Sequence, residues 1–115
     1  MARKVSDGRS VKVTVPAGTG TVQANTFAEV AGFFGLAVNT AAEGEQVVLL
    51  IEQAEYETSQ INAADAFAVG DAVYWDAANK VLTTSDGAGA NRRVGRVTQA
   101  KDANNVIWFV FEPLA

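Results

Sequence analysis

Carboxylates are the main candidates for chemistry in this sequence. The chain has 13 acidic residues and no histidine or cysteine. Without an imidazole or a thiol, Ser-His-Asp catalysis, Cys-His catalysis and the usual zinc sites are excluded. Asp71 and Asp76 flank one expected strand, and Glu55 and Glu57 share a strand face. Two carboxylates can hydrolyse a glycosidic bond, but acidic residues at strand ends and on solvated faces are far commoner than catalytic pairs. We therefore expect a protein that is not an enzyme, with a carboxylate hydrolase as the enzymatic alternative.

Two glycine-containing segments could form ligand loops, and both lack the residues that such loops require. The segment 18–20, Gly-Thr-Gly, has no following lysine and helix to hold a phosphate. The segment 86–89 has too few oxygen ligands for a calcium loop. We expect no cofactor and no metal. The net charge of −4 disfavours nucleic acid as a partner, and no apolar run approaches the roughly 20 residues of a membrane helix.

Three aromatic residues could form a binding surface for a sugar or for single-stranded nucleic acid, although the acidic balance of the chain counts against nucleic acid. Tyr74 and Trp75 are adjacent, so we expect one ring in the core and the other free for a subunit contact, without deciding which. Trp108 lies in the apolar run VIWFVF, and we expect it in the core. An exposed ring would also suit a module that binds carbohydrate or a host surface.

Charge is distributed in blocks along the chain. Residues 1–12 are basic, residues 13–79 contain acidic but no basic residues, and residues 80–102 are again basic. We expect residues 1–9 to form a flexible arm in which Arg3, Lys4 and Arg9 contact an acidic partner. A second basic group, Arg92, Arg93 and Arg96, is expected to pair with the acidic segment within the fold or between subunits. The alternatives are an ordinary solvated surface and a frayed terminus.

The elements that would position these residues are short strands. Residues 67–84 show alternating apolar positions on either side of Asp-Ala-Ala-Asn, which predicts a β-hairpin. Residues 10–16 predict a strand with Val11, Val13 and Val15 on one face, ended by Pro16. Residues 26–40 predict a bent strand or hairpin, because Gly32 and Gly35 make a helix costly. We expect the Phe33–Phe34 pair in the core.

The remaining segments are also mostly extended. Residues 44–59 have a helical alternative, but five consecutive apolar residues favour a buried strand. Residues 59–66 are expected to form one helical turn capped by Ser59 or Asn62, and residues 84–91 a loop. Residues 92–99 and 106–111 predict two more strands, the last of them in the middle of a sheet. The expected fold is all-β, a small barrel or sandwich of short antiparallel strands in a single domain over residues 10–115.

Several of these segments resemble a family of small phage capsid cement, or head decoration, proteins. The resemblance lies in the run VGDAVYWDAANKVLTT at residues 69–84, GLAV at 35–38, GEQV at 44–47 and VGRV at 94–97. It covers residues 20–111 and consists of apolar and turn motifs rather than chemically reactive residues.

This resemblance implies a structural role on a bacteriophage virion. Proteins of this kind sit on the outside of the head at local three-fold positions, commonly as trimers, and clamp neighbouring capsid subunits. The implied partners are the major capsid protein and further copies of the chain, and the implied place of synthesis is the bacterial cytoplasm. The residues expected at the subunit interface are Tyr74, Trp75, Arg92, Arg93 and Arg96.

Overall fold

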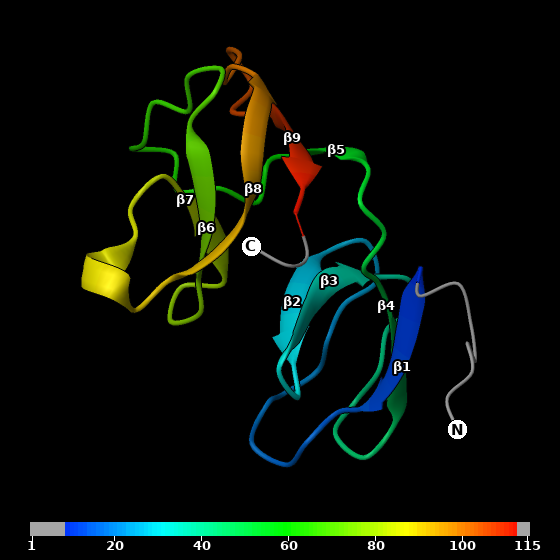
Figure 1. Cartoon of the computed structure of the whole chain (residues 1–115). Coiled ribbons are helices and arrows are strands. Elements are labelled where there is room, and N and C mark those ends of the chain that lie inside the picture. The colour runs from blue at the N-terminus through cyan, green and yellow to red at the C-terminus, as the bar shows by residue number, and fades with distance from the viewer. Residues whose placement is uncertain (1–8, 113–115) are drawn as a thin grey trace, which may run out of the picture. The chain divides into compact units, whose positions relative to one another are not determined.

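The computed structural model describes residues 9–112 and divides them after Glu52 into two compact units. We call the described residues 9–52 the N-terminal unit and the described residues 53–112 the C-terminal unit. Each unit is built on one antiparallel sheet (Figure 1). The N-terminal sheet has the order β1-β4-β3-β2, made of β1 (Ser10–Thr14), β2 (Phe27–Val30), β3 (Phe33–Ala37) and β4 (Gln46–Leu50). The C-terminal sheet has the order β5-β9-β8-β6-β7, made of β5 (Glu55–Thr58), β6 (Ala72–Asp76), β7 (Val81–Thr83), β8 (Arg92–Gln99) and β9 (Ile107–Phe111).

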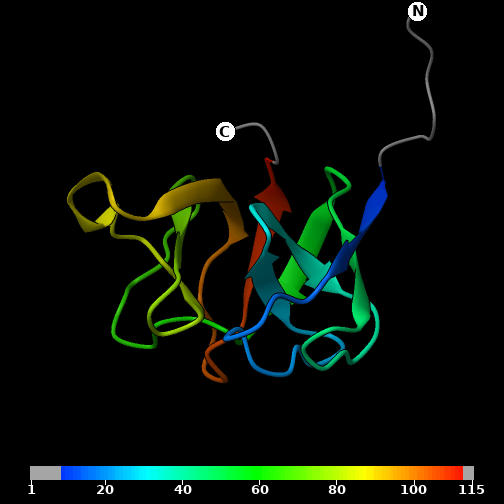
Figure 2. The same cartoon turned by 90° about the horizontal axis from the view of Figure 1, so that it is seen from below.

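The prediction of an all-β protein with short antiparallel strands is confirmed. Among residues 9–112 the helical content is one 3-10 turn, η1 (Gly87–Gly89), whose first residues are capped by the Asp86 carboxylate. The loop that carries η1, yellow in Figures 1 and 2, extends away from the strands of the C-terminal unit in both views. This turn lies inside the segment that the sequence predicts as a loop.

The N-terminal unit has a core of small aliphatic side chains on one face of its sheet. Val11 and Val13 of β1 are paired with Leu49 and Val47 of β4, and the following Val15 is fully buried. The alternation predicted for residues 10–16 is therefore confirmed. The buried core residues are Val15, Val22, Val30, Ala37, Ala41, Val47 and Leu49.

The hairpin predicted over residues 26–40 is confirmed as β2 and β3. Ala31 and Gly32 connect the strands with positive φ angles of 52° and 88°. Phe34 is buried and stacks on Phe27 with 5.6 Å between ring centroids. Phe33, however, is 43% exposed, so the expectation of a buried Phe33–Phe34 pair is wrong for Phe33. Neighbouring residues of a strand point to opposite faces, so Phe34 shares a face with Phe27, whereas Phe33 is on the face of Val30 and Ala37 and is exposed at the end of the hairpin, beside the turn.

Residues 44–59 are extended, as predicted, and the helical alternative is wrong. They do not form one strand: β4 belongs to the N-terminal sheet and β5 to the C-terminal sheet. In β4, Val47 and Leu49 face the core and Val48 and Leu50 face the other way. The apolar run is thus a strand with apolar residues on both faces, and the Glu-Tyr-Glu-Thr run after it is a separate strand.

The C-terminal unit contains the predicted hairpin as β6 and β7. Trp75 is 3% exposed and Tyr74 is half-buried, so Trp75 is the core residue of the pair. Strand β9 lies between β5 and β8, which confirms its predicted position inside a sheet. At the middle of β8, a Cβ on Gly95 would lie 2.9 Å from the Phe109 ring and collide with the Val110 carbonyl. Glycine at this position therefore lets β8 approach β9 closely.

Trp108 is not in the core, contrary to the prediction. Its side chain is 38% exposed, whereas Ile107, Phe109 and Phe111 of the same strand are buried. The three buried residues are two positions apart, which puts them on one face and Trp108 on the other. The high apolar content of this run hides a strict alternation.

The helical turn expected over residues 59–66 is absent. The Asn62 side chain accepts a hydrogen bond from Ala64 N–H at 3.1 Å, and Asp65 N–H donates to the Asn62 carbonyl at 3.0 Å. This is a turn closed by an asparagine side chain rather than a capped helix. Residues 60–62 instead run beside β7, where Ile61 forms a parallel bridge with Leu82.

Candidate interaction surface

One face of the C-terminal sheet is polar, and it carries three of the five residues predicted at the subunit interface. Because β6, β8, β9 and β5 alternate, every second side chain lies on the face opposite the buried residues. We call this the polar face. Its members are Glu55, Glu57, Ala72, Tyr74, Arg93, Arg96, Thr98, Trp108 and Val110.

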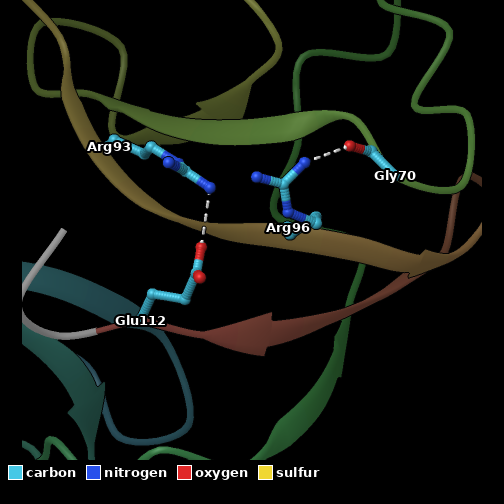
Figure 3. Close-up of polar contacts among 4 residues, drawn as sticks. All are labelled: Gly70, Arg93, Arg96 and Glu112. Atoms are coloured by element: carbon cyan, nitrogen blue, oxygen red, sulfur yellow. Dashed lines mark hydrogen bonds and ion pairs between the residues drawn. The ribbon is translucent and has the colours of Figure 1, made fainter.

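Arg93 and Tyr74 are direct cross-strand neighbours on the polar face. A β-bulge after Val73 brings Tyr74 opposite Arg93, and Arg93 Nη2 donates to Glu112 Oε1 at 2.9 Å (Figure 3). Both side chains of this ion pair are 34% exposed, so solvent screens it and it contributes little to stability. The buried Arg93 Nε has no hydrogen-bond partner among the described residues. Arg93 is therefore held in place but is only partly satisfied.

Arg96 contacts a carbonyl instead of a carboxylate. Its Nη1 donates to the Gly70 carbonyl at 2.7 Å (Figure 3), and Gly70 N–H donates to the Val97 carbonyl at 2.9 Å. These two bonds tie the loop before β6 to β8. Val69, at the tip of this loop, is 67% exposed. Arg96 thus keeps its positive charge on the polar face while positioning an exposed apolar side chain.

The predicted interface residues do not all lie together. Tyr74, Arg93 and Arg96 share the polar face, whereas Arg92 is opposite Trp75 on the other face. The three arginines therefore do not form one patch. Of the predicted arm, Arg9 is exposed and its carbonyl accepts from Ile51 N–H at 2.9 Å, which extends the β1–β4 pairing by one residue. Arg3 and Lys4 lie outside the described residues.

Three of the four carboxylates in the predicted pairs serve turns or a cross-strand contact. Asp71 Oδ2 accepts from Ala68 N–H at 2.9 Å, and Asp76 closes the β6–β7 turn at the other end of the five-residue strand β6. Hydrogen bonds from the Asn79 side chain and backbone, and from the Ala78 backbone, lower the pKa of Asp76, which favours its ionised form. Glu55 Oε2 accepts from the Thr98 hydroxyl at 2.6 Å.

Neither a metal cluster nor a membrane helix occurs in the described part of the chain. No group of three or more Asp and Glu side chains within residues 9–112 is arranged to hold a metal ion. Within the same residues, no helix is both long and apolar enough to cross a membrane.

Sequence reasoning missed the exposed aromatic residues Trp108 and Phe33. The signal for Trp108 is its position between the buried Ile107 and Phe109, out of phase with the core face. The signal for Phe33 is its place directly after the two-residue turn, at the end of the hairpin. Exposed aromatic rings are typical of protein interfaces.

Comparison with known proteins gives one result. No curated protein and no solved structure matches the chain. A family model described as "Phage cement protein" matches residues 5–111, which is nearly the whole chain and includes every strand of both sheets. The family is one of structural proteins of the phage capsid, and membership therefore suggests a structural role rather than an enzymatic one. The chain belongs to the phage cement protein family.

Proposed function

We propose that this protein binds the outer surface of an assembled phage head as a homotrimer and stabilises the shell by contacting the major capsid protein. The observation that carries the proposal is the family match over residues 5–111. It places the chain with the virion, and we infer that it joins the head from outside after synthesis in the bacterial cytoplasm.

Exposed apolar side chains support a role in protein contact. Phe33, Val38, Val69 and Trp108 are each between 38% and 67% exposed. Isolated exposed apolar residues are common, but a tryptophan and a phenylalanine at strand positions supply large, rigid contact surfaces. We infer that Trp108 and Val69 contact the capsid protein.

A trimer suits this role because cementing depends on many weak contacts. Linking three binding sites makes the second and third contacts intramolecular, which can raise the overall affinity about 10²- to 10⁴-fold without any new contact. The basic residues Arg3, Lys4 and Arg9 would add one cationic segment per subunit. Such segments accelerate the encounter with an acidic surface.

Binding to heads tests the proposal directly. Purified protein is mixed with undecorated heads of the phage whose genome encodes it, the heads are recovered by sedimentation, and bound protein is counted. We expect saturable binding and a higher temperature of DNA release from decorated heads. Heads that bind no protein, or that lose DNA at an unchanged temperature despite full occupancy, would contradict the proposal.

In the same assay, the double variant Arg3→Glu/Lys4→Glu tests the basic segment. Full occupancy of heads by that variant would remove the basic segment from the proposal.

The exposed Trp108 also favours a second candidate, a non-enzymatic module that binds carbohydrate on a host surface. Its indole has the carboxylate Glu57 on one neighbouring strand and the amide Gln99 on the other, and a ring flanked by polar groups can stack on a sugar. Binding to a glycan array that is lost on Trp108→Ala, without binding to heads, would favour this candidate.

A further inference from the structure

The outer edges of the strands β1 and β5 are open within residues 9–112. Along β7 the edge is covered: Leu82 N–H donates to the Gln60 carbonyl at 2.9 Å, and Asn62 N–H donates to the Leu82 carbonyl at 2.7 Å. Neither the β5 edge of the C-terminal sheet nor the β1 edge of the N-terminal sheet has such a cover among residues 9–112. Open edges are where one protein chain can add a strand to another.

On β1 the outward backbone groups belong to three exposed residues. Ile51 N–H donates to the Arg9 carbonyl and Val15 N–H donates to the Glu45 carbonyl, each at 2.9 Å. Hydrogen-bonded pairs alternate along an antiparallel ladder, so the odd-numbered residues of β1 bond to β4. The N–H and C=O groups of Ser10, Lys12 and Thr14 therefore point away from the sheet, and all three side chains are exposed.

On β5 the outward backbone groups belong to two glutamates. Phe111 N–H donates to the Ala54 carbonyl at 2.9 Å, which makes Tyr56 and Thr58 the next residues hydrogen-bonded to β9. Glu55 and Glu57 then direct their N–H and C=O groups away from the sheet. Both glutamate side chains are exposed.

The charges on the two edges select between possible pairings. Two β1 edges paired about their centres would put Lys12 against Lys12, and two β5 edges would put Glu55 against Glu57. Like charges directly opposite each other destabilise a strand pair, whereas opposite charges stabilise it. A β1 edge against a β5 edge puts a lysine opposite a glutamate, so the charges disfavour pairing of like edges and favour the mixed pair.

We propose that β1 of one copy pairs antiparallel with β5 of the next copy, with Lys12 opposite Glu57 or Glu55, and that this contact links the subunits of the trimer. The inference rests on the proposed function, because it assigns the subunit contact of that trimer. The contact uses two different surfaces and is therefore heterologous, and a heterologous contact builds a ring such as a trimer when the rotation from one subunit to the next closes on itself. Each copy would offer one β1 edge and accept one at β5.

The side chains between the charged positions also match. With Lys12 opposite Glu57, Thr14 is opposite Glu55 and Val13 is opposite Tyr56. Val13 and Tyr56 are each half-buried in a single copy of the protein. A β-branched and an aromatic residue are favourable cross-strand partners. The other register, two residues along, places Val11 opposite Tyr56 and keeps Lys12 opposite Glu55. Both registers therefore join a charged pair on one face and an apolar pair on the other.

Charge exchange at the two edges tests the proposal. The mass of each variant is measured by light scattering over a range of concentrations, and head binding is measured in parallel. The wild type should have three times the 12.1 kDa of one chain. Lys12→Glu should self-associate at least about tenfold more weakly than the wild type, and so should the double variant Glu55→Lys/Glu57→Lys. The triple variant with all three changes should regain the trimer, because its two edges are again complementary.

A control and a second measurement separate this contact from other effects. Lys80→Glu makes the same change of charge at an exposed turn residue and should leave the trimer intact. In the wild-type trimer the backbone amide hydrogens of residue 12 and Glu57 should exchange at least about tenfold more slowly than in the Lys12→Glu variant at a concentration where that variant is monomeric, because pairing of the two edges hydrogen-bonds them. A trimer that survives Lys12→Glu, a triple variant that folds but stays monomeric, or unprotected amides would each overturn the edge pairing. A wild-type protein that is monomeric and still binds heads would overturn the edge pairing but not the proposed function. Heads that bind neither the wild type nor any variant would count against the proposed function instead.

Discussion

Asp76 organises the turn between β6 and β7 with both of its carboxylate oxygens. Oδ1 accepts from Ala78 N–H at 3.1 Å and from Asn79 N–H at 3.3 Å, and Oδ2 accepts from the Asn79 side-chain amide at 2.8 Å. The Asp76 carbonyl also accepts from Lys80 N–H at 2.8 Å, which closes the loop. This is the physical reason that an Asp-Ala-Ala-Asn run is recognisable as a turn in the sequence: the aspartate supplies acceptors for the amides that the turn leaves unpaired.

Because these hydrogen bonds lower the pKa of Asp76, they make stability depend on pH in acid. The Asn79 side chain is the largest cause, followed by the Asn79 backbone. A carboxylate whose pKa is lower in the folded state stabilises the fold fully above its unfolded pKa of about 4 and loses that contribution as the pH falls through the folded value. We expect the free-energy difference in unfolding between wild type and Asp76→Asn to be constant near neutral pH and to shrink below about pH 4. Urea denaturation at several pH values measures this difference.

The Asn79→Ala variant is the control for the cause of this pKa shift. It removes the largest contribution and should move the pKa of Asp76 back toward its ordinary value. Carbon NMR titration of the Asp76 carboxyl group reports the pKa in both proteins. An Asp76 pKa that does not rise in Asn79→Ala would show that the turn does not act through this side chain.

Single residues also mark the limit of sequence reasoning. Period-two alternation correctly places Val11, Val13 and Val15 of the first strand on one face. Trp108 follows the same rule, yet it is predicted as core because its neighbours are so apolar. Phe33 does not follow it: it is in phase with the buried Gly35 and Ala37 but lies at the turn end of the hairpin, where it is exposed. Apolar content indicates that a strand is buried, whereas only the phase of the alternation says which side chains are. For adjacent rings such as Tyr74 and Trp75, the phase is known only once the partner strands are known.

At the scale of elements, the β2–β3 hairpin shows how a turn fixes a register. Val30 pairs with Phe33, and the two residues between them both have positive φ. Positive φ at both central residues is the pattern of the type I′ turn, whose twist matches that of the strands. Gly32 adopts this conformation without cost, but Ala31 carries a Cβ that disfavours it. The hairpin therefore contains one residue that is not optimal for its backbone.

Replacing Ala31 with asparagine should stabilise the protein. Asparagine tolerates the left-handed conformation and is preferred at the first central position of this turn, so we expect a gain of about 0.5–1 kcal/mol in the free energy of unfolding. Denaturation in urea measures the gain. The matched variant Gly32→Ala should lose about 1 kcal/mol, and the cause is purely conformational because a Cβ there would meet no atom within 4 Å. A loss of stability in Ala31→Asn would contradict the assignment of the turn.

Elements whose neighbours are distant in sequence were harder to predict than hairpins. The strand character of residues 44–59 follows from their apolar run, but their division between two sheets does not. Strand β4 is bounded by its pairing with β1 and β3, and β5 by its pairing with β9, which is far along the chain. Such pairings are set by tertiary contacts that no local pattern contains. The same holds for the polar face, which β5, β6, β8 and β9 assemble together.

At the scale of the whole molecule, the features suited to binding are exposed side chains rather than a catalytic site. Asp71, Asp76 and Glu55 have local hydrogen-bonding roles, and among residues 9–112 the largest apolar side chains that remain exposed are Phe33 and Trp108. The family match concerns a protein of capsids, and proteins that cement other proteins act through contact area and multivalency. We therefore expect substitutions of exposed residues to separate binding from folding.

Trp108→Ala should weaken binding to heads while leaving the fold intact. The indole lies on the polar face and is 38% exposed, so truncating it removes little core packing, whereas loss of a tryptophan anchor from an interface costs about 2 kcal/mol or more. We expect half-saturation of heads to require about 30-fold more protein, with a nearly unchanged midpoint of urea unfolding. Trp75→Ala is the matched control: this tryptophan is 3% exposed, and its truncation should cost about 3–5 kcal/mol of stability. Full occupancy by Trp108→Ala at wild-type concentrations would exclude this face from the capsid contact, and a large loss of stability would mean that Trp108 belongs to the core after all.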